Sequence, residues 1–218
     1  VIPEDNERDF HDIIQEYGET PLPKEIKRKV DKKDEERFQT VYAKNIGAVA
    51  APAAGLHFTD ILLKKLILKG VKIVNITSHT GLGTFKDIDV EDLTKHKMDS
   101  ENYSIPEETA EVVNEALDKG KRVFAVGTST MKTLETAVSA SDRLKPKSGW
   151  TDKFIFPPYE FKICGAMITN FHSPKSTLLM MASAYGGFDQ IMKAYKVAIK
   201  EKYMSVSYTH LTLPTNDQ

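Results

Sequence analysis

The sequence predicts an α/β fold with a mostly parallel sheet and helices on both faces. From about residue 47 onward, short apolar segments of strand type alternate with longer segments of helical spacing. The run RVFAVG at 122–127 is continuously apolar, which is typical of a strand buried on both faces of a parallel sheet. The stretch at 166–187 repeats the order of strand, polar turn and helix.

Start and stop signals place the individual elements. Residues 7–17 predict a short amphipathic helix that ends at Gly18. Residues 24–37 carry 12 charged residues in 14, which favours a solvated connection over an RNA-contacting strip. Later helices are expected at 60–69 with Thr59 as N-cap, 107–119, 128–140, 174–185 and 188–203; strands are expected at 71–77, 102–105, 122–127, 153–156 and 166–169, with a polar loop at 141–151.

Composition limits the partners and the compartment. The 218 residues include 30 basic and 31 acidic side chains, so no overall field attracts the chain to a membrane or a nucleic acid, and an RNA partner would need a local basic patch. The single cysteine, Cys164, excludes an internal disulfide framework and a multi-cysteine metal site, and it fits a reducing compartment. No secretory signal opens the sequence, so a cytoplasmic location is expected.

The polar turn at 170–177 is the first candidate site. It follows a short apolar strand and precedes a buried helix, whose start is signalled by Ser173 and Pro174. Ligands of open α/β sheets bind beyond the carboxyl ends of strands, which is where this turn lies. The candidate side chains are those of Asn170, His172, Lys175, Ser176 and Thr177.

The loop SHTGLGTF at 78–85 is the second candidate site. It carries His79, while Gly81 and Gly83 allow close backbone approach and offer amides to an anionic group. An equally weighted alternative for His79 is a turn histidine that hydrogen-bonds a carbonyl. The small-residue run at 47–60, which contains His57, predicts a backbone that passes close to another backbone or to a ligand.

The turn after the 122–127 strand is the third candidate site. Thr128, Ser129 and Thr130 place hydroxyls and helix amides together, a geometry that suits a phosphate or a carboxylate. The alternative is ordinary N-capping of the helix by Ser129.

Six segments together resemble a known family: GAVAAPAAGLHF, SHTGLGTF, HKMDSE, AVGTSTMKTLE, FIFPPYEFK and ITNFHSPKSTLLMMASAYGG. In this order and spacing they resemble the S-adenosylmethionine:tRNA ribosyltransferase-isomerases of queuosine biosynthesis, over about residues 37–203 and more weakly from Val1. The resemblance implies transfer and isomerisation of the ribosyl moiety of S-adenosylmethionine onto 7-aminomethyl-7-deazaguanine at the tRNA wobble position. The implied products are epoxyqueuosine-tRNA, adenine and methionine.

The resemblance also implies a domain organisation. Family members are longer, with an amino-terminal part that includes much of a β-barrel-like domain and is absent here. Residues 1–36 are therefore expected to be the remnant of that domain with a linker, and residues 37–206 the α/β catalytic domain. Residues 207–218 depart from the family pattern and are expected to be a non-native tail.

Site roles follow from the implied reaction. The sulfonium acidifies the adjacent ribose carbon, so a base of near-neutral pKa can begin the reaction by removing a proton, and histidine suits that task. The expected catalytic residues are His172, His79 and His57, with the first two preferred. Contacts with S-adenosylmethionine are expected from Gly81, Gly83, Thr84, Thr128, Ser129, Asn170, Ser176 and Thr177. Lys132 and Lys175 are expected to neutralise tRNA phosphates.

S-adenosylmethionine is thus expected as a co-substrate, with no permanently bound cofactor. The histidines lack paired metal-ligand spacing, so no metal is expected. The expected partner is tRNA carrying 7-aminomethyl-7-deazaguanine, without a membrane, and the expected oligomeric state is a monomer.

Two rival interpretations remain at this level. A conventional S-adenosylmethionine methyltransferase would form S-adenosylhomocysteine instead of free adenine, and its only support is the fold class and the glycine turns. A non-catalytic or inactive RNA-binding fragment would bind tRNA or S-adenosylmethionine without turnover.

Overall fold

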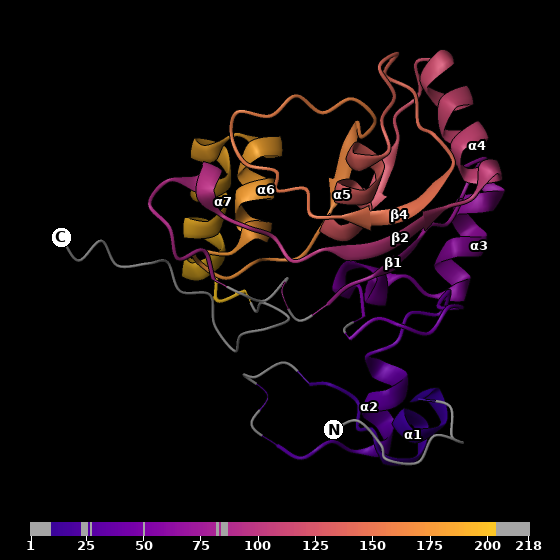
Figure 1. Cartoon of the computed structure of the whole chain (residues 1–218), viewed down its shortest axis with the longest axis vertical. Coiled ribbons are helices and arrows are strands. Elements are labelled where there is room, and N and C mark those ends of the chain that lie inside the picture. Colours follow the sequence, from indigo (N-terminus) through magenta and orange to yellow (C-terminus); the bar gives the residue numbers. More distant parts are fainter. Residues whose placement is uncertain are drawn as a thin grey trace.

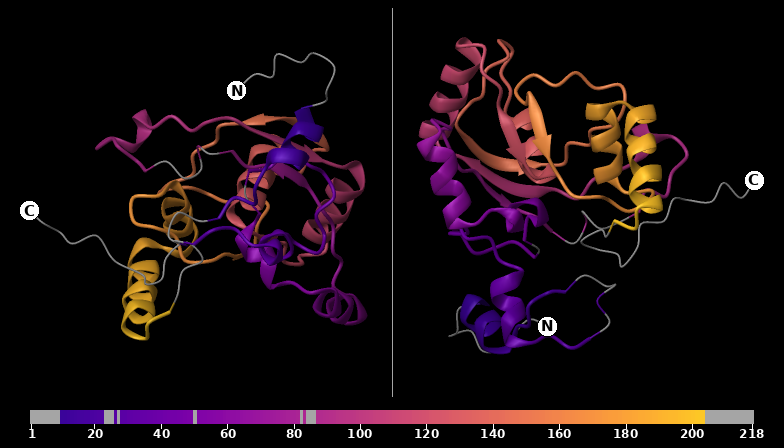
Figure 2. Two further views of the ribbon diagram at one scale, coloured as in Figure 1. Left: turned by 90° about the horizontal axis from the view of Figure 1, so that it is seen from below. Right: turned by 180° about the vertical axis from the view of Figure 1, so that it is seen from behind.

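A computed structural model of the chain describes residues 10–22, 26, 28–49, 51–81, 83 and 87–203. The fold is a mixed α/β arrangement with two small sheets (Figure 1). Helices α3 (Asp60–Leu68) and α4 (Glu107–Asp118) lie at one side of the sheets, and α6 (Thr177–Gly186) and α7 (Phe188–Lys200) at the other (Figures 1 and 2). Among the described residues, no helix has both the length and the apolar character to cross a bilayer.

The larger described sheet is antiparallel. It contains β1 (Thr77–His79), β2 (Glu101–Ile105) and β4 (Lys147–Thr151) in the order β1-β2-β4. Alternate residues of β2 are buried, namely Glu101, Tyr103 and Ile105, because side chains along a strand point to opposite faces. A short 3-10 helix, η3 (Leu93–Lys95), precedes β2.

The smaller described sheet is a parallel pair, β3 (Phe124–Val126) and β5 (Ala166–Ile168). Strand β3 leads directly into α5 (Thr128–Thr136), and β5 leads through the polar turn into α6. One core joins both sheets, with Tyr103, Ala125, Met131, Ile155 and Met181 among its buried members.

Helix α6 is largely buried, as its apolar sequence predicts: none of its residues is exposed. Leu179 packs with Tyr195 and Ala198 of α7 in a second apolar cluster. The helix begins at Thr177 with Ser176 as N-cap, so the predicted start at Ser173 and Pro174 is wrong. Both serines have N-cap chemistry, and the hydroxyl of Ser176 is the one that accepts from the Leu179 N–H, at 3.1 Å.

The amino-terminal region holds α1 (Phe10–Tyr17) and α2 (Lys32–Arg37), which lie together at one end of the molecule (Figure 1). The charged stretch is more than a solvated connection, because Asp34 is buried and both of its carboxylate oxygens lie 2.6 Å from guanidinium nitrogens of Arg28. Hydrogen bonds from Arg28 lower the Asp34 pKa to about 2. The described part of residues 1–36 contains helices and no strand, so a β-barrel-like remnant is not confirmed.

The mostly parallel sheet is likewise not confirmed. The predicted strands at 71–77 and 153–156 are replaced by β1 and β4, which are short and polar and pair antiparallel with β2. Segment 141–151, predicted as a loop, contains β4. The parallel pair and the helix capped by Thr59 are confirmed, with the Leu62 N–H 3.2 Å from the Thr59 hydroxyl.

Candidate functional site

The carboxyl ends of β3 and β5 form one edge, from which two candidate segments emerge. The Gly127 N–H donates to the Ile168 carbonyl at 2.9 Å and so holds the two strand ends together. Gly127 has a φ of 91°, a conformation that favours glycine, and this lets the chain turn at once into α5. The turn at 128–130 and the polar turn after β5 are therefore neighbours. Ligands of open α/β sheets bind at such an edge, beyond the carboxyl ends of the strands.

The small-residue run reaches the same edge. Its 3-10 helix η1 (Ala53–His57) places His57 Nε2 3.3 Å from Asn170 Nδ2. Pro52 lies beside Gly127, 4.0 Å from where a Cβ on that glycine would stand. The small-residue run thus lies against both turns at this edge, through Pro52 beside Gly127 and through the His57 side chain beside Asn170.

The loop after β1 meets the start of α5. Thr80 Oγ1 lies 3.3 Å from Ser129 Oγ, and the Val49 N–H donates to the Thr80 carbonyl at 3.0 Å. The His79 ring packs on Gly47, where an added Cβ would lie 2.6 Å from the ring. His79 Nε2 is buried without a hydrogen-bond partner in the described residues.

The glycines of that loop differ from each other. A Cβ on Gly83 would collide with the Asp99 side chain, so a larger residue at this position would require that side chain to move. Among the described residues, nothing lies within 4 Å of where a Cβ on Gly81 would stand. Thr84, another predicted contact, lies outside the described residues.

Hydrogen bonds fix both the backbone and the ring of His172. Its N–H donates to the Tyr195 hydroxyl at 2.7 Å, and its Nε2 lies 2.8 Å from Thr169 Oγ1. Burial lowers the His172 pKa to about 4, because the charged imidazolium loses its hydration. The ring is therefore neutral at neutral pH, and one of its nitrogens is already engaged.

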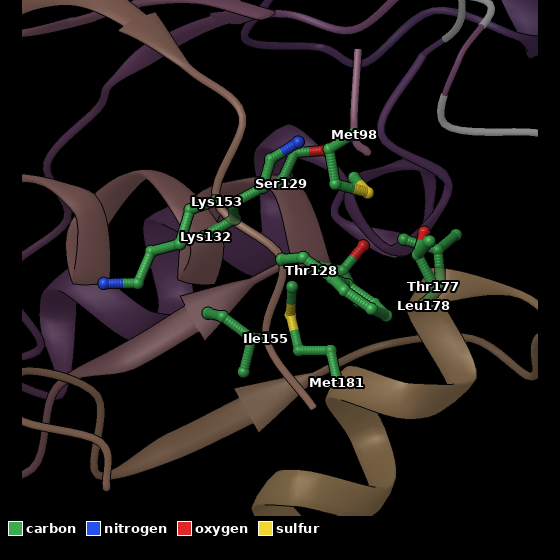
Figure 3. Close-up of a pocket in the computed structure, with 10 residues that line it drawn as sticks. Met98, Thr128, Ser129, Lys132, Lys153, Ile155, Thr177, Leu178 and Met181 are labelled. Atoms are coloured by element: carbon green, nitrogen blue, oxygen red, sulfur yellow. The ribbon is translucent and has the colours of Figure 1, made fainter. Parts of the chain in front are cut away.

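A narrow pocket lies at the start of α5 (Figure 3). Its polar wall is formed by Thr128, Ser129 and Thr177, the last from α6. Thr130 is not part of it, because its hydroxyl donates back to the Val126 carbonyl at 2.8 Å. The N-cap of α5 is Gly127, so N-capping by Ser129 is wrong. The other lining residues are Met98, Lys132, Lys153, Phe154, Ile155, Leu178 and Met181.

Lys132 and Lys175, the two lysines predicted to contact tRNA phosphates, lie in different surroundings. Lys132 is buried and its ammonium pairs with the Glu101 carboxylate, which does not fit contact with a tRNA phosphate at the surface. Lys175 is exposed, and its carbonyl accepts from the Ile88 N–H at 2.9 Å. Sequence reasoning assigned no role to Glu101, although it lies in the HKMDSE segment.

Three unpartnered polar atoms are buried at this edge: His79 Nε2, Asn170 Oδ1 and Thr177 Oγ1. Two further such atoms in the described residues belong to Tyr103 and Thr133, which do not line the pocket. A buried polar atom without a partner costs roughly 1–3 kcal/mol. Three of them along one edge indicate a place where a polar ligand completes the hydrogen bonds.

Comparison with known proteins identifies the family to which the chain belongs. A family model described as queuosine biosynthesis protein matches residues 2–213. The chain is 58% identical over 208 residues to an S-adenosylmethionine:tRNA ribosyltransferase-isomerase of Cytophaga hutchinsonii, covering 95% of this chain and 60% of that protein. It is 55% identical to the protein of the same name from Amoebophilus asiaticus, covering 94% of this chain and 59% of that protein.

A solved structure is also similar. It is the crystal structure of an S-adenosylmethionine tRNA ribosyltransferase from Thermotoga maritima, with 38% identity and a TM-score of 0.58. The match covers 73% of this chain and 50% of that one. The chain thus spans about three fifths of the length of the curated relatives that it matches.

Proposed function

Because the chain belongs to the queuosine biosynthesis protein family, we propose that it acts in transfer and isomerisation of the ribosyl moiety of S-adenosylmethionine onto tRNA. The acceptor in this proposal is 7-aminomethyl-7-deazaguanine at the wobble position, and the products are epoxyqueuosine-tRNA, adenine and methionine. S-adenosylmethionine is a co-substrate here, not a resident cofactor.

The observation that carries the proposal is the convergence of four separate segments on one edge. The contacts His57–Asn170 and Thr80–Ser129 join residues that are 113 and 49 positions apart. Unpartnered buried atoms occur on two of the converging segments, with His79 on the loop after β1 and with Asn170 and Thr177 on the turn after β5. Such a concentration of polar groups at a strand edge supports a substrate site rather than a structural network.

We assign proton removal from the ribose carbon to His79. Its Nε2 is buried and has no partner, so it is available to accept a proton from a substrate. Packing of the ring on Gly47 fixes its direction. A base must lie within hydrogen-bond reach of the proton that it removes, and a nitrogen already bonded to the protein is less suited to that task.

The other two histidines receive supporting roles. His172 has a low pKa and shares Nε2 with Thr169, so we assign it to shaping the turn that carries Asn170. His57 lies against Asn170 Nδ2, which leaves Asn170 Oδ1 to accept from a sugar hydroxyl. We assign backbone contact with S-adenosylmethionine to Gly81, which has open space on its Cβ side among the described residues.

The tRNA contact is assigned to Lys175, which is exposed beside the site. Lys132 is removed from that role by its pairing with Glu101. The proposal further places the enzyme in the cytoplasm as a monomer, with residues 37–206 as its catalytic domain. Light scattering of the purified chain measures its molar mass and so tests whether it is a monomer.

A turnover assay tests the proposed function. The chain is incubated with S-adenosylmethionine and with tRNA that carries the aminomethyl-deazaguanine base, and free adenine is quantified against a control without tRNA. Adenine and methionine release is the expected result. Formation of S-adenosylhomocysteine would instead favour a methyltransferase.

The same assay tests whether this stretch of sequence is sufficient. If a full-length relative releases adenine in parallel and this chain does not, essential groups lie outside these 218 residues. The activity proposed for the chain alone would then be refuted.

A further inference from the structure

The antiparallel sheet has one face that points away from the core. In β2, Asn102 and Ser104 alternate with the buried, core-facing residues, so their side chains lie on the opposite face. The hydroxyls of Ser104 and Ser148 are 2.7 Å apart, which confirms that β4 shares this face. We call it the outer face of the sheet.

The strand register places three side chains in one row across the outer face. His79 of β1 pairs with Asn102 of β2, and Asn102 pairs with Trp150 of β4. Figure 1 shows the three strands side by side. Side chains of paired residues lie on the same face, so Trp150 shares the face of His79. The backbone of Trp150 lies two strands, or about 10 Å, from that of His79.

Trp150 is an exposed aromatic side chain in polar surroundings. It is 69% exposed, and among the large hydrophobic side chains of β1, β2 and β4 it alone is exposed. Its neighbours on the outer face are the Ser104 and Ser148 hydroxyls and Asn102, whose Nδ2 donates to the Gly149 carbonyl at 3.2 Å. A protein interface has an apolar core of several side chains, so one flat ring among polar groups favours a stacked nucleobase over a protein.

Two lysines near Trp150 supply positive charge. Lys147 is the first residue of β4, Lys145 lies two positions before it, and both are exposed. Neither lysine forms an ion pair with another described residue. Asp152 is the one acidic residue between 145 and 153. The charge is therefore locally positive although the whole chain is nearly balanced, as contact with an RNA backbone requires.

We propose that the outer face holds an unpaired nucleobase of the tRNA anticodon loop, with Trp150 as its stacking platform. Asn102, whose Nδ2 is used within the sheet, offers Oδ1 to the base, and Lys145 and Lys147 contact the flanking phosphates. Because the row ends at His79, a nucleotide next to the wobble position reaches Trp150 while the wobble base lies near the histidine. That the RNA is a tRNA rests on the proposed function, whereas the stacking of a nucleobase rests on the sheet face.

Fluorescence of Trp150 tests the proposal, because this residue is the single tryptophan of the chain. The whole chain is titrated at fixed salt concentration with an RNA hairpin that has the sequence of a tRNA anticodon stem and loop, and with a blunt RNA duplex of the same stem. The hairpin should quench the emission and protect the ring from acrylamide, since a stacked base covers it. The duplex offers no unpaired base and should leave the emission unchanged.

Trp150→Ala measures how much stacking contributes to affinity. Binding of a fluorescein-labelled hairpin, followed by anisotropy, should weaken about tenfold or more, because each base stacked on an aromatic ring contributes substantially to binding. Trp150→Tyr keeps a stacking ring and should lose much less affinity. Both variants should change the thermal midpoint little, since the side chain is exposed.

Phe188→Ala is the matched control. Phe188 is an aromatic side chain of similar exposure, 62%, and it lies on α7 at the other side of the sheets. Its removal should leave the hairpin affinity unchanged. An equal loss of affinity in Phe188→Ala and Trp150→Ala would show a general effect of exposed rings and would overturn the assignment.

Four further results would also overturn it: no binding of the hairpin, hairpin binding without quenching, equal quenching by the duplex, or unchanged hairpin affinity in Trp150→Ala. The adenine assay separates this failure from failure of the proposed function. Adenine release by Trp150→Ala with an unchanged KM for tRNA removes only the stacking surface. Quenching by the hairpin without adenine release supports the surface and counts against turnover by this chain.

Discussion

The two ends of α5 contrast in how their buried polar groups are satisfied. At the carboxyl end, the buried Glu135 carboxylate accepts from the backbone N–H groups of Lys162, Ile163 and Cys164 at 3.0–3.2 Å. At the amino end, Thr177 across the pocket has no partner. At the carboxyl end, the Glu135 carboxylate holds a loop and has its hydrogen-bond partners without a ligand. At the amino end, the buried Thr177 hydroxyl lacks a partner among the described residues, and we call this the incomplete end.

The surroundings of Glu135 confirm that its end is structural. Burial, followed by the Glu135 charge, raises the pKa of the Cys164 thiol to about 12, so this cysteine stays protonated and unreactive. Burial and the same carboxylate raise the Tyr159 pKa to about 12. The comparison therefore predicts that substitutions near Glu135 change stability, and that substitutions at the incomplete edge change binding and turnover.

The largest expected effect concerns turnover. His79→Gln removes the unpartnered nitrogen and should lower the rate of adenine release by about 10²–10⁴-fold, the usual contribution of a general base. The free energy of unfolding and the affinity for S-adenosylmethionine should change little, since Nε2 makes no protein hydrogen bond. Single-turnover adenine release and urea unfolding measure the two quantities. A variant that keeps its rate would remove His79 as the base.

The next largest effect is expected for the buried Lys132–Glu101 ion pair, whose lysine lines the pocket. The side chains of Lys132 and Glu101 are only 5% and 3% exposed, so Lys132→Met leaves a buried carboxylate without its cation. The free energy of unfolding should fall by about 3–5 kcal/mol in urea titrations. The double variant Glu101→Leu/Lys132→Met should recover much of that loss. If the single and double variants are equally unstable, the pair is not what stabilises this region.

Glu135→Ala tests the carboxyl end of α5, where the buried carboxylate has its hydrogen-bond partners. Three buried N–H groups lose their acceptor, so the free energy of unfolding should fall by about 3 kcal/mol. Glu135→Gln keeps one acceptor oxygen and should lose less. The affinity for S-adenosylmethionine should be unchanged in whatever fraction remains folded. Loss of this affinity without loss of stability would reverse the assignment of the two ends.

The last expected effect is the pH dependence caused by His172, which reaches its full size only near pH 4. Its pKa is about 4 in the folded chain against 6.5 ordinarily, so the unfolded chain binds more protons between these values. The free energy of unfolding should therefore fall as the pH drops from 6.5 towards 4, by about 3 kcal/mol at most. His172→Gln should flatten this slope in unfolding curves measured across that range. An unaltered slope would assign the pH dependence to other groups.

The sequence predicted the candidate edge better than it predicted the sheets. Strand β3, the turn at Thr128 and the polar turn after β5 were recognisable from apolar runs and start signals that are local in the chain. Strands β1 and β4 read TSH and KSGWT and have no strand pattern of their own, so their pairing with β2 depends on tertiary contacts.

Within the site, local chemistry was visible and long-range pairing was not. His57, His79 and Asn170 stood out by residue type and position. The partnership of Lys132 with Glu101 joins residues 31 positions apart, and no spacing rule reveals it. The choice of Ser176 over Ser173 as N-cap likewise depended on geometry, since both residues can cap a helix.

Mapping S-adenosylmethionine onto the isotope-labelled chain by NMR tests the central claim most directly. The incomplete edge should respond, with amide shifts at Gly81, Ser129, Asn170 and Thr177, while the loop at 162–164 held by Glu135 should stay unchanged. Shifts confined to 162–164, or none at the edge when a full-length relative binds S-adenosylmethionine under the same conditions, would contradict the assignment of this edge as the substrate site.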